Sequence, residues 1–174
     1  LNQGIDIPVD TSEIGQLSGS IIKTKDSLNT LARDTDSLLN AAMEGRLDVR
    51  AGTSRFKGSY RKIVEGINKM LDIVATPIEE ALEVLGLMVQ NDFTKKMEGE
   101  YKGQLRQLPN SVNALRDRLL SIEHVFVKVS NGDTSMLEDL LKLGKRCEND
   151  NIVPAAIGMM QAIQGLINEV KNIT

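Results

Sequence analysis

Few residues of this chain belong to types that catalyse reactions or bind metals, and they stand apart from one another. His124 is the single histidine, so phosphorylation of an imidazole is the first chemistry to consider. The surrounding segment, Ile122-Glu123-His124-Val125-Phe126, lacks the downstream proline of kinase phosphorylation motifs. Because His124 lies two residues past the apolar helix position Ile122, we place it on the solvent side of its helix. We therefore interpret His124 as an exposed residue without a catalytic role.

The single cysteine, Cys147, has basic neighbours of the kind that can activate a thiol. One cysteine cannot form an internal disulfide, and its solitary use suits a reducing compartment. We interpret it as an ordinary surface thiol. The sequence also has no glycine-rich phosphate loop, no metal-spaced His and Cys set and no nucleophile triad. We expect no enzymatic activity, no cofactor, no metal and no small-molecule ligand.

The composition of the 174 residues points to helices packed through aliphatic side chains. Apolar residues make up 41% of the chain, but aromatic residues only 3%, and tryptophan is absent. The net charge is −3 without a basic stripe, so we expect no nucleic-acid partner. No apolar run approaches the ~20 residues of a membrane span, and no signal peptide is present. The chain begins with Leu1 in mid-pattern, which we interpret as a piece of a longer protein whose membrane segments lie outside it.

The stretch from Tyr60 to Val89 organises the chain. Apolar residues recur there in alternating steps of three and four, the spacing of a helix packed along another helix. We call such a row a seam, and this one contains Tyr60, Ile63, Ile67, Met70, Val74, Pro77, Ala81, Val84 and Met88. A second row beside it contains Val64, Leu71, Ile78 and Leu85. This width predicts a helix with more than one neighbour, as in a four-helix bundle.

Further helices are predicted by the same spacing. Their seams are Ile14, Leu17, Ile21, Thr24, Leu28, Leu31, Thr35, Leu38 and Ala42; Leu105, Leu108, Val112, Leu115, Leu119, Ile122, Phe126 and Val129; and Ala156, Met159, Ile163, Leu166, Val170 and Ile173. Thr11 or Ser12 is placed to cap the first helix, and Pro154 to open the last. The segment 75–80, Ala-Thr-Pro-Ile-Glu-Glu, is a helix-start signature, yet the central seam crosses it in step. This predicts two nearly coaxial helices or one kinked helix.

The seams repeat along the chain. They begin at Ile14, Tyr60, Leu105 and Ala156, with offsets of 46, 45 and 51 residues. Polar connectors at 46–59 and 90–103 separate them, and a longer connector after Val129 contains a short amphipathic piece at 136–143. This regularity predicts a tandem array of helix–connector–helix units. A monomeric α-solenoid of helix pairs has overlapping periods and is the alternative architecture.

The third helix differs from the first two in length. From the first seam residue to the last, the span is 28 residues at 14–42 and at 60–88, but 24 residues at 105–129. The third helix therefore enters its connector half a heptad out of phase with the others. Because the position of a packing face follows its period, we expect neighbouring units to rest in different packings.

The helix ends and connectors resemble those of HAMP domains, the linker modules of bacterial chemoreceptors and sensor kinases. Ser12-Glu13-Ile14-Gly15 resembles the family's Asp-Glu-x-Gly opening of the second helix, with Ser in place of Asp. Pro77 stands where the family often has a proline early in the first helix. The family's connector glycine is matched by Gly45, Asn91 and Gly132, and its connector hydrophobics by Leu47, Val49, Phe93 and Met97. Residues 40–49 and 63–68 are similar to the multi-HAMP arrays of methyl-accepting chemotaxis proteins.

The resemblance covers essentially the whole chain and implies an all-α fold. Two chains would form an elongated homodimer of tandem, parallel four-helix coiled-coil bundles. The expected division is the second half of a preceding HAMP unit at 1–27, HAMP units at 28–74 and 75–121, and a divergent HAMP unit at 122–174. The acidic opening is missing from the later units, so their assignment rests on periodicity.

The resemblance also implies a function. The array would relay a conformational change from a sensor or transmembrane input to a chemoreceptor signalling domain of the same chain, within the cytoplasmic part of an inner-membrane receptor. The residues expected to act through packing, without binding a ligand, are Glu13, Gly15, Gly45, Leu47, Val49, Ile67, Met70, Pro77, Phe93, Met97, Leu115, Gly132 and Pro154. The alternatives are the HAMP linker of a sensor histidine kinase and a static dimeric coiled-coil spacer, which would need seams but no connectors.

Overall fold

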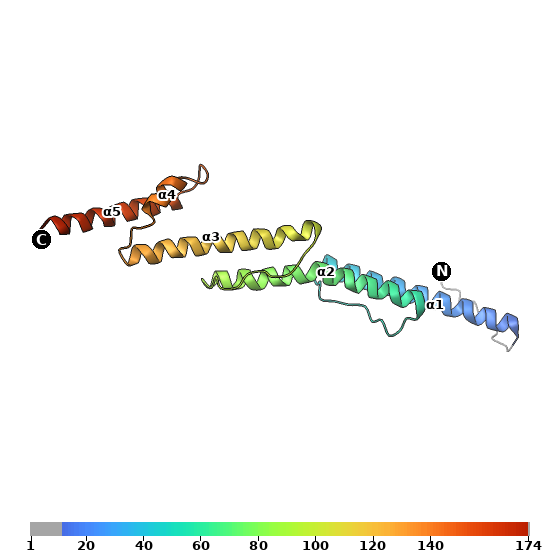
Figure 1. Cartoon of the computed structure of the whole chain (residues 1–174). Helices are drawn as coiled ribbons and strands as arrows, with labels where there is room; N and C mark the ends of the chain where they lie inside the picture. The colour runs from blue at the N-terminus through green and yellow to red at the C-terminus, as the bar shows by residue number, and fades with distance from the viewer. Residues whose placement is uncertain (1–11, 174) are drawn as a thin grey trace. The chain divides into compact units, whose positions relative to one another are not determined.

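The computed structural model describes residues 12–173, and the predicted roles of Thr11 and of the start of unit 1–27 lie outside that range. Within it the chain is all-α, as predicted, with no strand. The elements are α1 (Glu13–Met43), α2 (Gly58–Val89), a 3-10 helix (Gly103–Arg106), α3 (Gln107–Ser130), α4 (Leu137–Leu143) and α5 (Ile152–Ile173) (Figure 1). We call residues 44–57, 90–102 and 131–151 the first, second and third connectors; the third contains α4.

The ends of the long helices follow from local hydrogen bonds. Ser12 caps α1 by accepting a hydrogen bond from the Gly15 amide through its Oγ, at 3.2 Å. At the other ends of α1, α2 and α3, the chain turns through a residue with positive φ: Gly45 at +77°, Asn91 at +59° and Gly132 at +69°. Glycine adopts this conformation without strain, and asparagine tolerates it better than most residues.

The same pair of backbone bonds closes each of these three turns. The residue after the turn residue donates to a carbonyl five residues earlier: Arg46 to Ala41 at 2.8 Å, Asp92 to Leu87 at 3.0 Å and Asp133 to Lys128 at 2.9 Å. The turn residue itself donates to the carbonyl three residues earlier, at 3.0 Å in each case. These bonds satisfy carbonyls that a helix end would leave unpaired.

Pro77 lies inside α2, and α2 is one continuous helix from Gly58 to Val89. Of the two arrangements that the helix-start signature left open, the structure therefore has the single helix. The expectation that Pro154 opens the last helix was wrong by two residues. The carboxylate of Asp150 accepts from the amides of Ile152 and Val153, at 3.0 and 3.3 Å, so α5 begins at Ile152.

The chain divides into two compact units, one ending at Glu79 and the other beginning at Glu80. In the first unit, the buried apolar residues come from α1, the first connector and α2: Leu38, Ala41, Phe56, Val64 and Ala75. The second unit has two apolar clusters. One contains Ala81, Val84, Met88, Phe93, Met97 and Val112, and the other contains Val125, Leu140, Val153, Ala156 and Met160. Each connector therefore contributes side chains to the core, which a solvated linker would not do.

Candidate functional site: apolar helix faces and connector anchors

In the first part of α2, most of the seam is exposed, and the row beside it is buried at Val64 and half-buried at Leu71. Val64 in the second row is 1% exposed, whereas Met70 in the seam is 58% exposed. Ile63 and Val74, also in the seam, are exposed as well, and Ile67 is half-buried. The chain thus covers one of the two rows by itself and leaves the other uncovered.

In the last part of α2, the arrangement is reversed. The seam residues Ala81, Val84 and Met88 are buried in the first cluster, while Leu82 is 65% exposed and Val89 is exposed too. The exposed residues here, Ile78, Leu82 and Val89, together with the half-buried Leu85, have steps of four, three and four. Counting from Tyr60 in alternating steps missed Leu82 and Val89, because the count continues unchanged through Pro77 while the exposed row moves by one position.

Exposed seam residues continue on the other helices of the described range. On α3, Leu115 is 49% exposed and Phe126 is exposed, although Val112 between Leu108 and Leu115 is buried. The remaining exposed apolar seam residues are Ile14, Leu17, Ile21 and Leu28 on α1 and Met159, Leu166, Val170 and Ile173 on α5. Heptad-spaced apolar rows of this extent mark an interaction surface rather than scattered surface residues.

Two asparagines fasten the first two connectors to the helix that follows each of them. The side-chain amide of Asn68 on α2 accepts from the backbone amide of Ala51 at 3.0 Å and donates to its carbonyl at 2.9 Å. Asn113 on α3 does the same with Met97, at 2.9 Å for both bonds. An amide side chain that pairs with both backbone groups of one residue fixes that residue in extended conformation.

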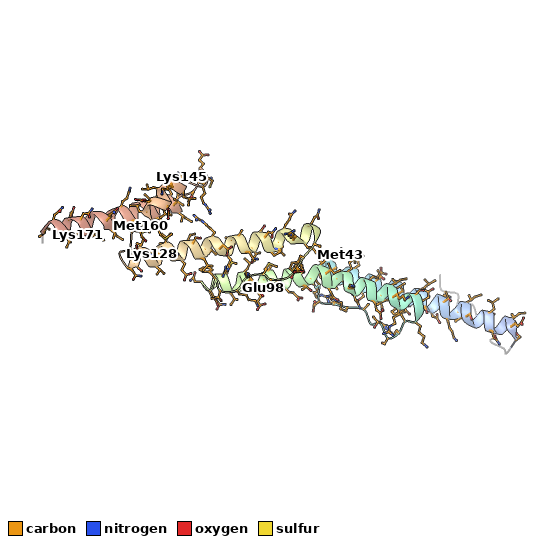
Figure 2. The ribbon with its side chains drawn as sticks, in the orientation of Figure 1. Met43, Glu98, Lys128, Lys145, Met160 and Lys171 are labelled. Atoms are coloured by element: carbon orange, nitrogen blue, oxygen red, sulfur yellow. The ribbon has the colours of Figure 1, made fainter. Side chains whose placement is uncertain are left out.

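Two carboxylates fasten the same connectors to the helix that precedes each of them. Asp34 on α1 accepts from the Arg55 guanidinium at 2.8 Å. Glu80 on α2 accepts from the backbone amides of Glu98 and Gly99 through Oε1, at 2.7 and 3.2 Å, and from the Tyr101 hydroxyl through Oε2, at 2.6 Å. Figure 2 labels Glu98 on the segment that runs along the last part of α2.

These contacts change the titration of the pair in the second unit. The hydrogen bond from Tyr101 and those from the two backbone amides lower the pKa of Glu80 against the opposing effect of burial. The same carboxylate, together with burial, raises the pKa of Tyr101 to about 12. Both shifts favour an ionised Glu80 beside a neutral phenol at neutral pH.

Arginines add further bonds to connector carbonyls. Arg116 on α3 donates to the carbonyl of Phe93 at 2.7 Å and to that of Thr94 at 3.3 Å. In the first connector, Arg50 donates to the carbonyl of Leu47 at 2.5 Å and pairs with Asp72 on α2 at 2.7 Å. Both connectors are thus held along their length by side chains of the flanking helices.

The third connector is held in a different way. Lys128, labelled in Figure 2, lies on α3 and donates to Asp133 at 2.6 Å. This contact holds the pKa of Asp133 well below its usual range. Leu140 of α4 is buried in the second cluster, against residues of α3 and α5. Gln164 occupies the position of Asn68 and Asn113, eight residues after the seam start, and is exposed. Burial of α4 thus takes the place of an asparagine anchor.

A hollow of about 550 Å³ lies between α3, α4 and α5. Its apolar lining includes the seam residues Ile122, Phe126 and Met159, with Val125 and Leu140 of the second cluster. Arg118, Asp139 and Arg146 also line it. Because seam residues of both α3 and α5 line it, we regard it as part of the exposed apolar face of these two helices.

The residues singled out from the sequence are spread over all parts of the described chain and do not meet at one site. Phe93 and Met97 are buried in the first cluster, Leu47 and Val49 are half-buried, and Pro154 is exposed. His124 and Cys147 are both exposed. Sequence reasoning missed the four anchors, Asp34, Asn68, Glu80 and Asn113. Their signal was repetition: Asp34 and Glu80 are 46 residues apart, and Asn68 and Asn113 are 45 apart.

Comparison with known proteins agrees with this architecture of helix, anchored connector and helix. The model of the HAMP domain family matches residues 55–120, which include all of α2, the second connector and α3 up to Leu120. This stretch is a HAMP domain. The matched residues include Glu80 and Asn113, which anchor the second connector, and also Asn68, which anchors the first. It covers 66 of the 174 residues, so the family of the remaining segments stays a prediction.

A relative among characterised proteins is a chemoreceptor. The chain is 24% identical over 81 residues to the methyl-accepting chemotaxis protein McpB of Pseudomonas aeruginosa. The aligned part is 47% of this chain and 12% of McpB, so the chain corresponds to a small part of that protein. No solved structure matches the chain. In the described range, no helix has both the length and the apolar character needed to span a membrane. A HAMP domain together with a chemoreceptor relative supports a signal-relaying linker role.

Proposed function

We propose that the chain is a tandem HAMP array of a chemoreceptor, in which two copies associate in parallel and pass a conformational change along shared four-helix bundles. The proposal rests on the heptad-spaced apolar rows that the single chain leaves exposed. The occupant of these rows is a second copy of the chain. A helix pair with one covered and one uncovered apolar row supplies two of the four helices of a bundle and half of its core. A second copy related by a twofold axis supplies the other two helices and the other half.

The exposed rows are energetically substantial. Fully burying one Leu or Met side chain contributes about 1.5–3 kcal/mol, and Met70, Leu82 and Leu115 are each about half exposed or more. Several such residues on α2 and α3 together provide enough apolar surface to offset the entropy lost in association. The wall of the hollow between α3, α4 and α5 would be covered by the same partner.

Relay follows from the two-row design. A bundle whose apolar face is wider than one seam can pack in more than one helix rotation with a small difference in free energy. The continuous α2, which runs through Pro77 from one unit into the next, would pass a change in one packing to the other. The proposed division is 28–74, 75–121 and 122–174, with the input before residue 28 and a chemoreceptor signalling domain after residue 174. The parent protein would be a membrane-anchored receptor.

Disulfide crosslinking between two copies tests the dimer. Cys147 is exposed and is first replaced by serine. In that background, Leu115→Cys places a thiol on the exposed seam of α3, and Asn110→Cys places one on the opposite, also exposed, face. We expect rapid oxidation of Leu115→Cys to a covalent dimer and slow oxidation of the control. Equal rates, or a monomer in sedimentation equilibrium at micromolar concentration, would exclude this architecture.

Relay is tested in the full-length receptor. The rate of Leu115→Cys crosslinking is compared with and without the stimulus of the upstream domain. A changed rate supports relay, because the packing at the seam has moved. An unchanged rate favours the static spacer. A histidine phosphorylation domain following residue 174 would instead make the chain the linker of a sensor kinase.

A further inference from the structure

The two carboxylate anchors occupy equivalent places in consecutive units. Asp34 and Glu80 each lie eleven residues before the left-handed residue that ends their helix. Their partners, Arg55 and Tyr101, each lie ten residues after it. The geometry therefore repeats even though the chemistry differs, since one contact is an ion pair and the other a hydrogen bond from a neutral hydroxyl.

In the second connector, the anchors divide cleanly between the two flanking helices. Asn113 and Arg116 belong to α3 and hold Met97 and Phe93 by their backbone groups. Glu80 belongs to α2 and receives three hydrogen bonds, from the amides of residues 98 and 99 and from the hydroxyl of residue 101. Among the described residues, the other polar contact from an α2 side chain to this connector is an ion pair between Lys95 and Glu83, both well exposed, and exposed pairs contribute little. The apolar side chains of α2 in the first cluster also pack with Phe93 and Met97, but such contacts tolerate repacking.

We propose that Glu80 is a latch that fastens the second connector to α2, so that the last part of α2 moves relative to α3 only when these three hydrogen bonds open. The connector would then stay with α3 through Asn113 and Arg116, and α2 would be the helix that is released. This assigns a regulatory step to a residue outside the apolar seams. The latch itself concerns one chain, and only its effect on signalling rests on the proposed relay.

The chemistry of the latch makes it selective for a carboxylate. All three groups that point at Glu80 are donors, and an ionised carboxylate is an acceptor at both oxygens. An amide of the same shape can still accept from both backbone amides through its oxygen and can donate its NH₂ group to the Tyr101 hydroxyl, but its neutral oxygen is a weaker acceptor than an ionised carboxylate. Before the third connector, the residue eleven before Gly132 is Ser121, whose hydroxyl donates to the Asp117 carbonyl, so the carboxylate latch is a feature of the first two connectors.

The test is backbone amide exchange in Glu80→Gln, measured residue by residue. We expect the amides of Glu98 and Gly99 to exchange at least about tenfold faster than in the parent chain, because their acceptor is weakened. The Ala51 amide, bonded to Asn68 in the first unit, should not change. Glu79→Gln is the matched control, since Glu79 is the exposed neighbour on the same helix turn.

Two results would overturn the latch. One is exchange at Glu98 and Gly99 equal to that of Glu79→Gln. The other is equal acceleration at Ala51, which would mean general destabilisation. If Glu80→Gln fails to fold, Tyr101→Phe replaces it, because it removes a single hydroxyl and leaves the carboxylate in place. We expect it to accelerate exchange at Glu98 and Gly99 by a smaller factor, and no acceleration there would also count against the latch.

The latch and the proposed function can fail separately. If Leu115→Cys forms no covalent dimer while Glu80→Gln still frees the Glu98 and Gly99 amides, the dimeric relay is excluded and the latch remains. If the dimer forms and responds to the stimulus but Glu80→Gln leaves both the amides and the response unchanged, the relay remains and the latch is excluded. Loss of the stimulus-dependent change in crosslinking in Glu80→Gln, with the dimer intact, is the expected result.

Discussion

The second and third connectors do the same topological task by different physical means. The second is extended and, besides the burial of its Phe93 and Met97, is held by directional hydrogen bonds from both flanking helices, through Glu80, Asn113 and Arg116. The third contains α4 and is held mainly by burial of Leu140 against α3 and α5. Hydrogen bonds fix one register, because an amide must meet its own acceptor, whereas apolar contacts tolerate sliding and repacking. The second connector therefore specifies one docked position, and the third specifies only that its apolar face is covered.

The largest effect expected from this contrast is at the buried residue of the third connector. Leu140→Ala should reduce the free energy of unfolding by about 2–5 kcal/mol, because it removes a buried aliphatic side chain and leaves a cavity. Leu141→Ala on the same helix is the control, since Leu141 is exposed, and we expect it to change stability by less than about 0.5 kcal/mol. Urea unfolding measures both. Similar losses at the two positions would show that α4 is not held by burial.

A smaller loss is expected when the asparagine anchor is removed. Asn113→Ala deletes two hydrogen bonds and leaves both backbone groups of Met97 without that partner, so we expect a loss of about 1–3 kcal/mol. Gln164→Ala, at the equivalent position of the third unit, should change the free energy of unfolding by less than about 0.5 kcal/mol. If Gln164→Ala were as costly as Asn113→Ala, the two connectors would be held alike and the contrast would be lost.

The sequence predicted the helices well because their ends have local causes. The last seam residues Ala42, Met88 and Val129 lie within one residue of the ends of α1, α2 and α3. Each helix stops where a glycine or asparagine can adopt positive φ. The amphipathic piece predicted at 136–143 is α4, with its N-cap at Met136. Such features depend on a few neighbouring residues and can be read without the fold.

The sequence could not predict which of the two apolar rows of α2 is buried by other parts of the same chain. Both rows are apolar and heptad-spaced, and burial of Val64 in one part and Val84 in another depends on what lies across from them. The anchors were missed for a related reason. Asn68 or Glu80 on a helix surface has the same appearance in sequence as any solvated polar residue, and its role depends on a connector segment that lies about 17 or 18 residues away along the chain.

The smallest expected effect is the response to acid. As the pH falls, the contacts of the second connector should be lost before those of the third. The pKa of Glu80 is lowered from its ordinary value of 4.5, mainly by the Tyr101 hydroxyl, so its contribution to docking is present above 4.5 and is lost as the pH falls through the lowered value. Lys95 adds a weaker attraction, and Lys96, Glu98 and Arg116 are the other charged groups around this carboxylate. The Lys128 ammonium holds the pKa of Asp133 well below its usual range, so the turn that opens the third connector should persist to lower pH.

The measurement is amide exchange between about pH 6 and about pH 3, corrected for the intrinsic effect of pH on the exchange rate. The Glu98 and Gly99 amides should lose protection first, and the Ser135 amide, which donates to Asp133 at 2.9 Å, should lose it later. Glu80→Gln should abolish the pH dependence at Glu98 and Gly99 and leave that at Ser135 unchanged. If the Ser135 amide lost protection before those of Glu98 and Gly99, the charged contacts of the third connector would be weaker than those of the second. The difference between the connectors would then lie in the strength of their attachment and not in its kind.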